Sequence, residues 1–178
     1  MRAIVVYESM YGNTHTIAEA VADGLRRSTP DVAVVPVGKA SAELMQSADV
    51  VVVGAPTHVH GMSRPSTRAS AVEAANKPET QLTLDADAHG LGVRDWLAVI
   101  GPSTALAAAF DTRMPGPSAF TGRASHAIDR HLRRHGFGRI AAPESFLVDK
   151  QNHLLPGESD RAREWGNALA ATVLGARA

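Results

Sequence analysis

The stretch Ser9–Thr14 (SMYGNT) places hydroxyl groups and small residues between an apolar run and a helical pattern. Ser9, Tyr11 and Thr14 supply hydroxyl groups, and Gly12 tolerates the left-handed backbone of a tight turn. A helix that begins here would offer free N–H groups and the positive end of its dipole, so a phosphate could bind without a lysine. The stretch lacks the lysine of an NTPase P-loop and the G-x-G-x-x-G of a dinucleotide-binding turn. It therefore predicts an anion site at a helix N-terminus, although a simple N-cap would explain one of its residues.

Other polar residues indicate chemistry less clearly. His58 and His60 have a spacing that could hold a metal ion, but a third ligand is not apparent, and we expect no metal site. His131 and His135 lie four residues apart with arginines between them, which favours a solvated basic helix face. Glu8 is an isolated carboxylate, for which we expect hydrogen bonds to backbone groups. No Ser-His-Asp set and no pair of carboxylates stands out, so the sequence predicts no catalytic residue.

The elements that must position these residues alternate along the chain. Apolar runs rich in β-branched residues indicate strands, and apolar residues on one helical stripe indicate helices. The alanine-rich run 106–110 has helix propensity, but its place in the alternation favours a strand. The predicted strands are Ala3–Tyr7, Val32–Val37, Val50–Val53, Leu106–Phe110 and Arg139–Val148. The predicted helices begin near Asn13 and Ser159 or cover Ala42–Gln46, Ser66–Ala75, Val93–Ile100 and Ser118–His135, and residues 76–92 are expected to form an exposed loop.

Five such units predict an α/β fold, a three-layer α-β-α sandwich around a five-stranded parallel sheet. Proline cannot donate to a sheet ladder and is confined mostly to edge strands. Pro36 and Pro143 lie within the second and fifth predicted strands, which favours the order 2-1-3-4-5 in a single domain of residues 1–178. In such a sheet, ligands bind at the carboxyl ends of the strands where the order reverses. The segments expected to line one site are Glu8–Thr14, Pro56–Arg64 and Asp111–Ser118.

The composition excludes several classes of function. Of the 178 residues, 18 are Lys or Arg and 18 are Asp or Glu, so no net charge would attract nucleic acid or an anionic membrane. The chain contains no cysteine, which excludes disulfides, thiol nucleophiles, iron–sulfur clusters and thiolate zinc sites. No apolar run is long enough to span a bilayer. We therefore expect a cytoplasmic protein without membrane insertion.

Two of the three segments resemble those of a known family. SMYGNT resembles the flavodoxin phosphate loop, T/S-x-T-G-N-T, with tyrosine in place of the usual threonine. GAPTHVHG (Gly54–Gly61) is similar to the family's loop after the third strand, where a Pro-Thr or similar pair lies against the flavin ring. The similarity covers the whole chain in the order of its elements and in length. It implies a flavodoxin-like fold with FMN as the cofactor.

The resemblance also assigns residues to FMN. The first loop would hold the phosphate, and the other two would contact the two sides of the flavin ring. Asp111 could bond the polar edge of the flavin or serve as a turn residue. The residues assigned in this way are Ser9, Met10, Tyr11, Gly12, Asn13, Thr14, Pro56, Thr57, His58, Val59, His60, Gly61, Asp111, Thr112, Arg113, Met114 and Gly116.

The sequence departs from electron-carrying flavodoxins at the ring end of the expected site. Those proteins are strongly acidic and usually place aromatic residues on the flavin, whereas the second and third loops here lack Trp and Tyr. Trp96 and Trp165 lie on predicted helices and are expected in the core. Fewer electron-rich faces, and an arginine such as Arg113 near the ring, would make a reduced anionic flavin less unfavourable.

Three functions stay open from the sequence. The first is an FMN-binding flavodoxin-family protein that transfers electrons to and from a redox partner protein. The second is an FMN-dependent NAD(P)H:quinone-type oxidoreductase. The third is a flavin-free module with the flavodoxin fold that serves binding or regulation.

Overall fold

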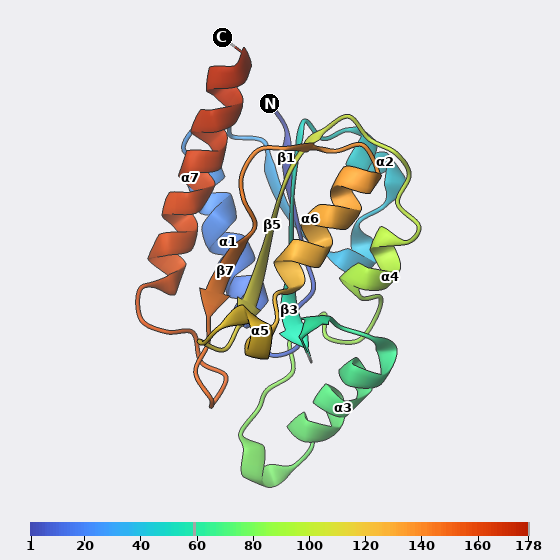
Figure 1. Ribbon diagram of the computed structural model, residues 1–178, viewed down its shortest axis with the longest axis vertical. Coiled ribbons are helices and arrows are strands. Elements are labelled where there is room, and N and C mark those ends of the chain that lie inside the picture. The colour runs from blue at the N-terminus through green and yellow to red at the C-terminus, as the bar shows by residue number, and fades with distance from the viewer. Residues whose placement is uncertain (59, 178) are drawn as a thin grey trace.

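The computed structural model describes residues 1–58 and 60–177, the backbone alone at 176 and 177, and its centre is a parallel sheet (Figure 1). The strands are β1 (Ala3–Tyr7), β2 (Val32–Pro36), β3 (Val50–His58), β4 (Gly61–Met62), β5 (Leu106–Arg113), β6 (Gly138–Arg139) and β7 (Glu144–Leu147). The order is β2-β1-β3-β5, and β6 and β7 both pair with the outer edge of β5. The short strand β4 pairs antiparallel with the end of β3. The predicted order 2-1-3-4-5 is therefore confirmed.

Helices cover both faces of the sheet, which confirms the predicted three-layer sandwich (Figure 1). The helices are α1 (Asn13–Arg26), α2 (Ala42–Gln46), α3 (Pro65–Ala75), α4 (Val93–Leu97), α5 (Ser118–Thr121), α6 (Ala124–Arg134) and α7 (Glu158–Arg177), with 3-10 turns η1 (Val37–Lys39) and η2 (Pro78–Thr80). α1 and α7 pack on one face, and α2, α4 and α6 pack on the other. α3 and η2 extend beyond the edge of the sheet at which the strands end. None of the helices in the described ranges has the length and apolar character needed to cross a membrane.

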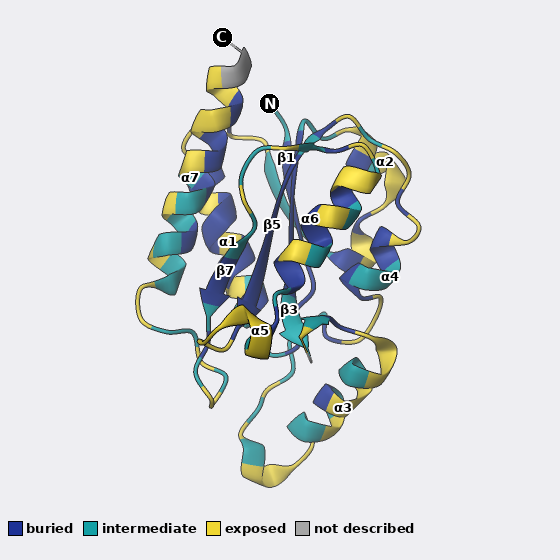
Figure 2. Cartoon of the chain, in the orientation of Figure 1, coloured by how far each residue is buried: buried dark blue, intermediate teal, exposed yellow. Residues whose placement is uncertain are grey.

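The strands are apolar on both sides because both faces of the sheet are covered. In β1, Ile4 and Val6 belong to the core beneath α2, α4 and α6, while Val5 and Tyr7 belong to the core beneath α1 and α7. Figure 2 shows the central strands as buried and the outer helix surfaces as exposed. This double burial explains why the strand runs of the sequence are nearly continuous rather than alternating.

Helices α1 and α7 meet at two glycines. A Cβ atom added at Gly24 would collide with the carbonyl group of Arg163, and one added at Gly166 would collide with that of Val21. The two backbones therefore approach more closely than larger residues would permit. Trp165 packs beside this contact, edge-on to Phe110 and Phe146, which confirms its predicted place in the core.

Two predicted elements are interrupted. The predicted helix Ser118–His135 is wrong as one helix, because it breaks between α5 and α6. Gly122 has φ of 73° at this break and forms a bridge with His60, where a side chain would collide with the histidine backbone. The predicted strand Arg139–Val148 is likewise two strands, β6 and β7, and Pro143 lies in the gap between them. The predicted helix Val93–Ile100 is present but ends at Leu97.

Two predicted strand ends are also wrong, because β3 and β5 run beyond Val53 and Phe110. Pro56 therefore lies inside a central strand. The carbonyl of Gly54 accepts from the Glu8 N–H on the β1 side, and backbone groups of alternate residues face the same side. The nitrogen of Pro56 thus faces a position beyond the end of β1, where no ladder hydrogen bond is lost.

Candidate functional site

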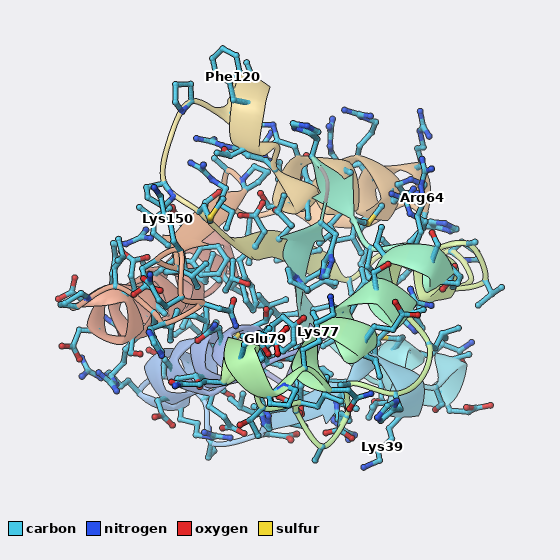
Figure 3. The ribbon with its side chains drawn as sticks, turned by 90° about the horizontal axis from the view of Figure 1, so that it is seen from below. Lys39, Arg64, Lys77, Glu79, Phe120 and Lys150 are labelled. Carbon is cyan, nitrogen blue, oxygen red and sulfur yellow. The ribbon has the colours of Figure 1, made fainter. Side chains whose placement is uncertain are left out.

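A cavity of about 210 Å³ opens at the carboxyl ends of β1, β3 and β5. Figure 3 views the molecule from this end, with Lys150 to one side of β3 and Arg64 to the other. The three segments expected from the sequence all contribute to the lining, together with a fourth segment that follows β7. The lining residues are Ser9, Met10, Tyr11, Asn13, Thr14, Pro56, Thr57, His58, Thr112, Arg113, Met114, Val148, Asp149, Lys150 and Asn152.

The first wall is the turn between β1 and α1. Gly12 has φ of 89° at the N-cap of α1, a conformation that glycine adopts without strain. Its N–H donates to Ser9 Oγ at 3.1 Å, which closes the turn. No side chain of the described residues caps α1, and its first turn contains no acidic residue. The N-terminus of α1 therefore offers N–H donors and positive potential to the cavity.

The hydroxyl groups of this wall have different orientations. Thr14 Oγ1 lies 2.7 Å from Thr112 Oγ1, so a buried hydroxyl pair joins the first wall to β5. Tyr11 lines the cavity, but its hydroxyl donates to the carbonyl of Ala71 on α3 at 2.8 Å. The prediction that Tyr11 supplies a hydroxyl donor to an anion is therefore wrong. Burial raises the pKa of Tyr11, so the phenol stays neutral.

Contacts behind the turn hold it in place. The Asp85 N–H donates to the carbonyl of Met10 at 2.8 Å, and His15 Nδ1 lies 3.2 Å from Asp85 Oδ2. The His15 ring stacks on Tyr7 with centroids 4.3 Å apart. The loop that was expected to be merely exposed thus supports the first turn of α1.

The second wall is the extended end of β3. Pro56, Thr57 and His58 lie in the strand and line the cavity. Burial, and then the charge of Arg68, lower the pKa of His58, so its ring is neutral near neutral pH. His60, with φ of 73°, and Gly61 turn the chain into β4 and line a neighbouring hollow instead. Val59, which the resemblance also assigned to FMN, lies outside the described residues.

The third wall is the end of β5 and the loop that follows it. Asp111 lies on this strand, but its side chain faces away from the cavity. Because β5 runs to Arg113, Asp111 is a strand residue rather than the turn residue proposed from the sequence. Its carboxylate is buried and accepts from the N–H of Ser125, at the start of α6, at 2.8 Å. Thr112 faces the cavity, as the alternation of a strand requires. The structure therefore places Asp111 in support of a helix, away from the expected ligand.

Arg113 ends β5 beside the cavity. Its Nη1 donates to the carbonyls of Met114 and Gly116 and to Thr121 Oγ1. The side chain is 9% exposed and forms no ion pair among the described residues. It is thus a buried cation that fixes the loop after β5. Met114 lines the cavity and is half exposed, whereas Gly116, with φ of 131°, shapes the loop without lining it.

The fourth wall, residues 148–152, was missed by the sequence analysis. Asp149 accepts from the N–H groups of Gln151 and His153, and the hydrogen bond from His153 is the main cause of a lowered pKa at Asp149. The carbonyl of Asn152 accepts from Asn13 Nδ2 at 2.7 Å, which ties this turn to α1. A polar turn directly after the fifth strand was the available signal, since every parallel strand ends at this edge.

Several other predictions concern residues outside the cavity. The carboxylate of Glu8 accepts from the N–H of Val93 at 2.8 Å, which confirms its expected bond to backbone. Trp96 is buried and its Nε1 donates to the carbonyl of Ala40, which confirms its place in the core. His135 Nε2 lies 2.9 Å from the carbonyl of Leu97. Among the described residues, no group of three or more acidic or histidine side chains could hold a metal ion.

Comparisons with known proteins agree with this arrangement. A family model described as Flavodoxin matches residues 5–165. A flavodoxin from the domain Archaea shares 21% identity with a TM-score of 0.68, over 98% of this chain and 99% of that one. A Streptococcus pneumonia flavodoxin shares 23% identity with a TM-score of 0.65, over 96% and 99% of the two chains. A flavodoxin, WrbA-like protein from Agrobacterium tumefaciens shares 20% identity with a TM-score of 0.60, over 98% of each chain. A search of curated protein sequences found no match.

Proposed function

This chain belongs to the flavodoxin family, and from that premise we propose that it binds FMN and transfers electrons to and from a redox partner protein. The observation that carries the proposal is the uncapped N-terminus of α1 at the wall of the cavity. Helix N-termini of this kind bind phosphate through free N–H groups and the helix dipole. A cytoplasmic location, which the cysteine-free sequence suggests, is part of the proposal.

The residues at the cavity suit the two ends of FMN. At the phosphate end, Ser9, Gly12 and Thr14 lie at the start of α1, whose first turn contains no acidic residue. At the ring end, the largely apolar side chains of Pro56 and Met114 lie on different walls. The 210 Å³ of the cavity is less than the volume of pockets that enclose a whole ligand. A flavin would therefore keep an exposed edge, as electron transfer to a partner protein requires.

FMN, when bound, accepts and donates electrons. The charges and side chains around it set its reduction potential. Arg113 is a buried cation beside the cavity, and Lys150 adds a second cation at its rim. Positive charge beside the cavity stabilises negative charge on a reduced ligand bound there. The described lining contains no tryptophan, and its tyrosine, Tyr11, is tied to α3.

These features favour a second candidate, an FMN-dependent NAD(P)H:quinone-type oxidoreductase. A cavity wall without electron-rich indole and with a buried arginine is suited to two-electron reduction of its ligand. Rapid consumption of NADPH by the FMN-loaded protein in the presence of a quinone would support this candidate. A protein that binds FMN but gives no turnover would support the electron carrier.

FMN binding is tested by titrating the flavin with the protein and following flavin fluorescence. Thr14→Asp places a negative charge at the start of α1, and we expect FMN affinity to fall by more than about a hundredfold. Thr16→Asp places the same charge on the exposed side of the same turn and serves as the matched control, with a loss of less than about tenfold. Unchanged fluorescence with stoichiometric wild-type protein would refute FMN binding and leave the flavin-free module. Unaltered affinity in Thr14→Asp would place the phosphate elsewhere.

A further inference from the structure

A second hollow lies beside the candidate site, with His58 in the wall of both. It holds about 490 Å³ and lies between the β3–β4 hairpin and the starts of α3 and α4. The polar side chains of its lining are His58, His60, Arg64, Ser66, Thr67 and Arg94. None of its described lining residues is acidic. Figure 3 shows Arg64 on the opposite side of β3 from Lys150, so this basic pocket is distinct from the rim of the first cavity.

Arg94 is a fixed cation at this basic pocket. Its Nε donates to the carbonyl of Ser63 at 2.9 Å, and one terminal nitrogen, Nη2, donates to that of Met62 at 2.8 Å. Two backbone carbonyls therefore hold the guanidinium in place but leave its charge uncompensated. Neither Arg94 nor Arg64 forms an ion pair within the described ranges. A guanidinium held in this way loses little freedom when it binds an anion.

The carboxylates of Asp95, which follows Arg94, and of Glu8, which bonds Ser63, do not cancel this charge. Asp95 pairs with Arg68, whose Nη2 lies 2.8 Å from Asp95 Oδ2. Glu8 is buried with its carboxylate hydrogen-bonded to Ser63, and burial raises its pKa, which disfavours its charged form. The hydroxyl of Ser63 accepts from Arg68 Nη1, so Arg68 is bound to both Asp95 and Ser63. The local excess of charge is therefore positive.

We propose that the basic pocket binds the phosphate group of a small-molecule redox substrate. Two guanidinium groups and the hydroxyl of Ser66 form a donor set that matches a phosphate, which accepts several hydrogen bonds at once. A substrate anchored there would extend past His58 into the first cavity. Phosphorylated nicotinamide dinucleotides belong to this class. This proposal rests on the proposed function in one respect: a redox-active ligand in the first cavity would react with the molecule bound in the basic pocket.

The test uses pyrophosphate as the probe and the full chain carrying Thr14→Asp, in which the start of α1 no longer accepts an anion. Spectra of protein labelled with ¹⁵N-arginine follow the side-chain N–H signals, and pyrophosphate is expected to shift those of Arg94 and Arg64 saturably. Arg64→Gln, an exposed change, should weaken binding about tenfold. Lys77→Gln removes an exposed cation just beyond the other end of α3 and should leave binding unchanged.

Three results would overturn the proposal. These are the absence of a saturable shift, equal weakening by Lys77→Gln and Arg64→Gln, and equally tight binding of malonate, which would show a general anion site. Because the readout needs no flavin, failure of FMN binding in the fluorescence titration would leave this result unaffected. The two failures are therefore distinguishable.

Discussion

The N-termini of α1 and α6 lie at the same edge of the sheet, yet they are satisfied in different ways (Figure 1). At α6, Asp111 accepts from the N–H of Ser125, and Thr57 Oγ1 accepts from the N–H of Ala124. At α1, no side chain among the described residues serves as a cap. One helix start is closed by acceptors of the chain itself, and the other faces a cavity.

The start of α4, like that of α6, is capped by an acidic side chain. Glu8 follows β1 directly, and its carboxylate accepts from the N–H of Val93, the first residue of α4. The acidic residue after β1 and the one within β5 thus both accept hydrogen bonds from the first N–H groups of neighbouring helices. At α1, by contrast, no side chain of the described residues accepts from the first N–H groups, so these donors can bind an external anion. Acidic side chains therefore stabilise the starts of α4 and α6, whereas the start of α1 stays open to the cavity.

The largest expected effect on stability concerns Asp111, which caps the start of α6. Asp111→Ala removes a buried acceptor from the start of α6, and we expect the free energy of unfolding to fall by about 2–3 kcal/mol. Asp111→Asn retains an acceptor and should lose less. Chemical denaturation of the ligand-free protein measures both. An unchanged free energy of unfolding in Asp111→Ala would show that the carboxylate does not stabilise α6.

A smaller effect on stability is expected at Gly12, at the start of α1. Gly12→Ala forces a residue with a Cβ into the left-handed region, which costs about 1–2 kcal/mol of stability. No atom lies within 4 Å of the added Cβ, so the cost comes from the backbone alone. Gly101→Ala is the control, because that glycine also has open space but no positive φ. Equal stability of the two variants would contradict a strained turn at α1.

The sequence patterns that predicted the fold are local ones. Alternating strand and helix segments, with Pro36 and Pro143 in the second and fifth predicted strands, were sufficient for the sheet order. The alanine-rich run 106–110 was correctly assigned as a strand because its position in the alternation outweighed its helix propensity. The strand ends could not be predicted, because they depend on pairing with neighbours distant in the sequence, as Pro56 opposite Thr112 shows.

The same limit affected the site. Three of its four walls follow from the order of the strands, whereas the orientation of single side chains does not. An extension of β5 by three residues, from Phe110 to Arg113, turns Asp111 to the face opposite Thr112. The hydroxyl of Tyr11 is bound by Ala71, sixty residues away, and no local pattern indicates that contact. Residues 148–152 were missed because the site was expected only after the first, third and fourth strands, beside the point where the strand order reverses.

The pH dependence of stability distinguishes Glu8 from an exposed carboxylate. Burial raises its pKa above the ordinary value, against smaller lowering effects of hydrogen bonds from Ser63 and Val93. Its contribution is therefore complete below the ordinary carboxyl range and is lost as the pH rises through the folded-state pKa. Glu8→Gln should flatten the fall in stability with rising pH. Denaturation curves from pH 4 to pH 8 measure the difference between the two proteins, and parallel curves would contradict a raised pKa.

The smallest expected effect tests whether the start of α1 lacks an anion. Thr16→Asp adds a charge to the exposed side of its first turn and should stabilise the ligand-free protein by about 0.5 kcal/mol. His126→Asp makes the matching change in the first turn of α6, where Asp111 and Thr57 already accept from the first N–H groups. Its gain should be smaller, and thermal unfolding at low salt measures both. If the open end of α1 is reserved for a ligand phosphate, saturating FMN should reduce or reverse the advantage of Thr16→Asp, since the aspartate and the phosphate then repel each other. An advantage that persists unchanged with FMN bound would mean that the phosphate lies away from this turn.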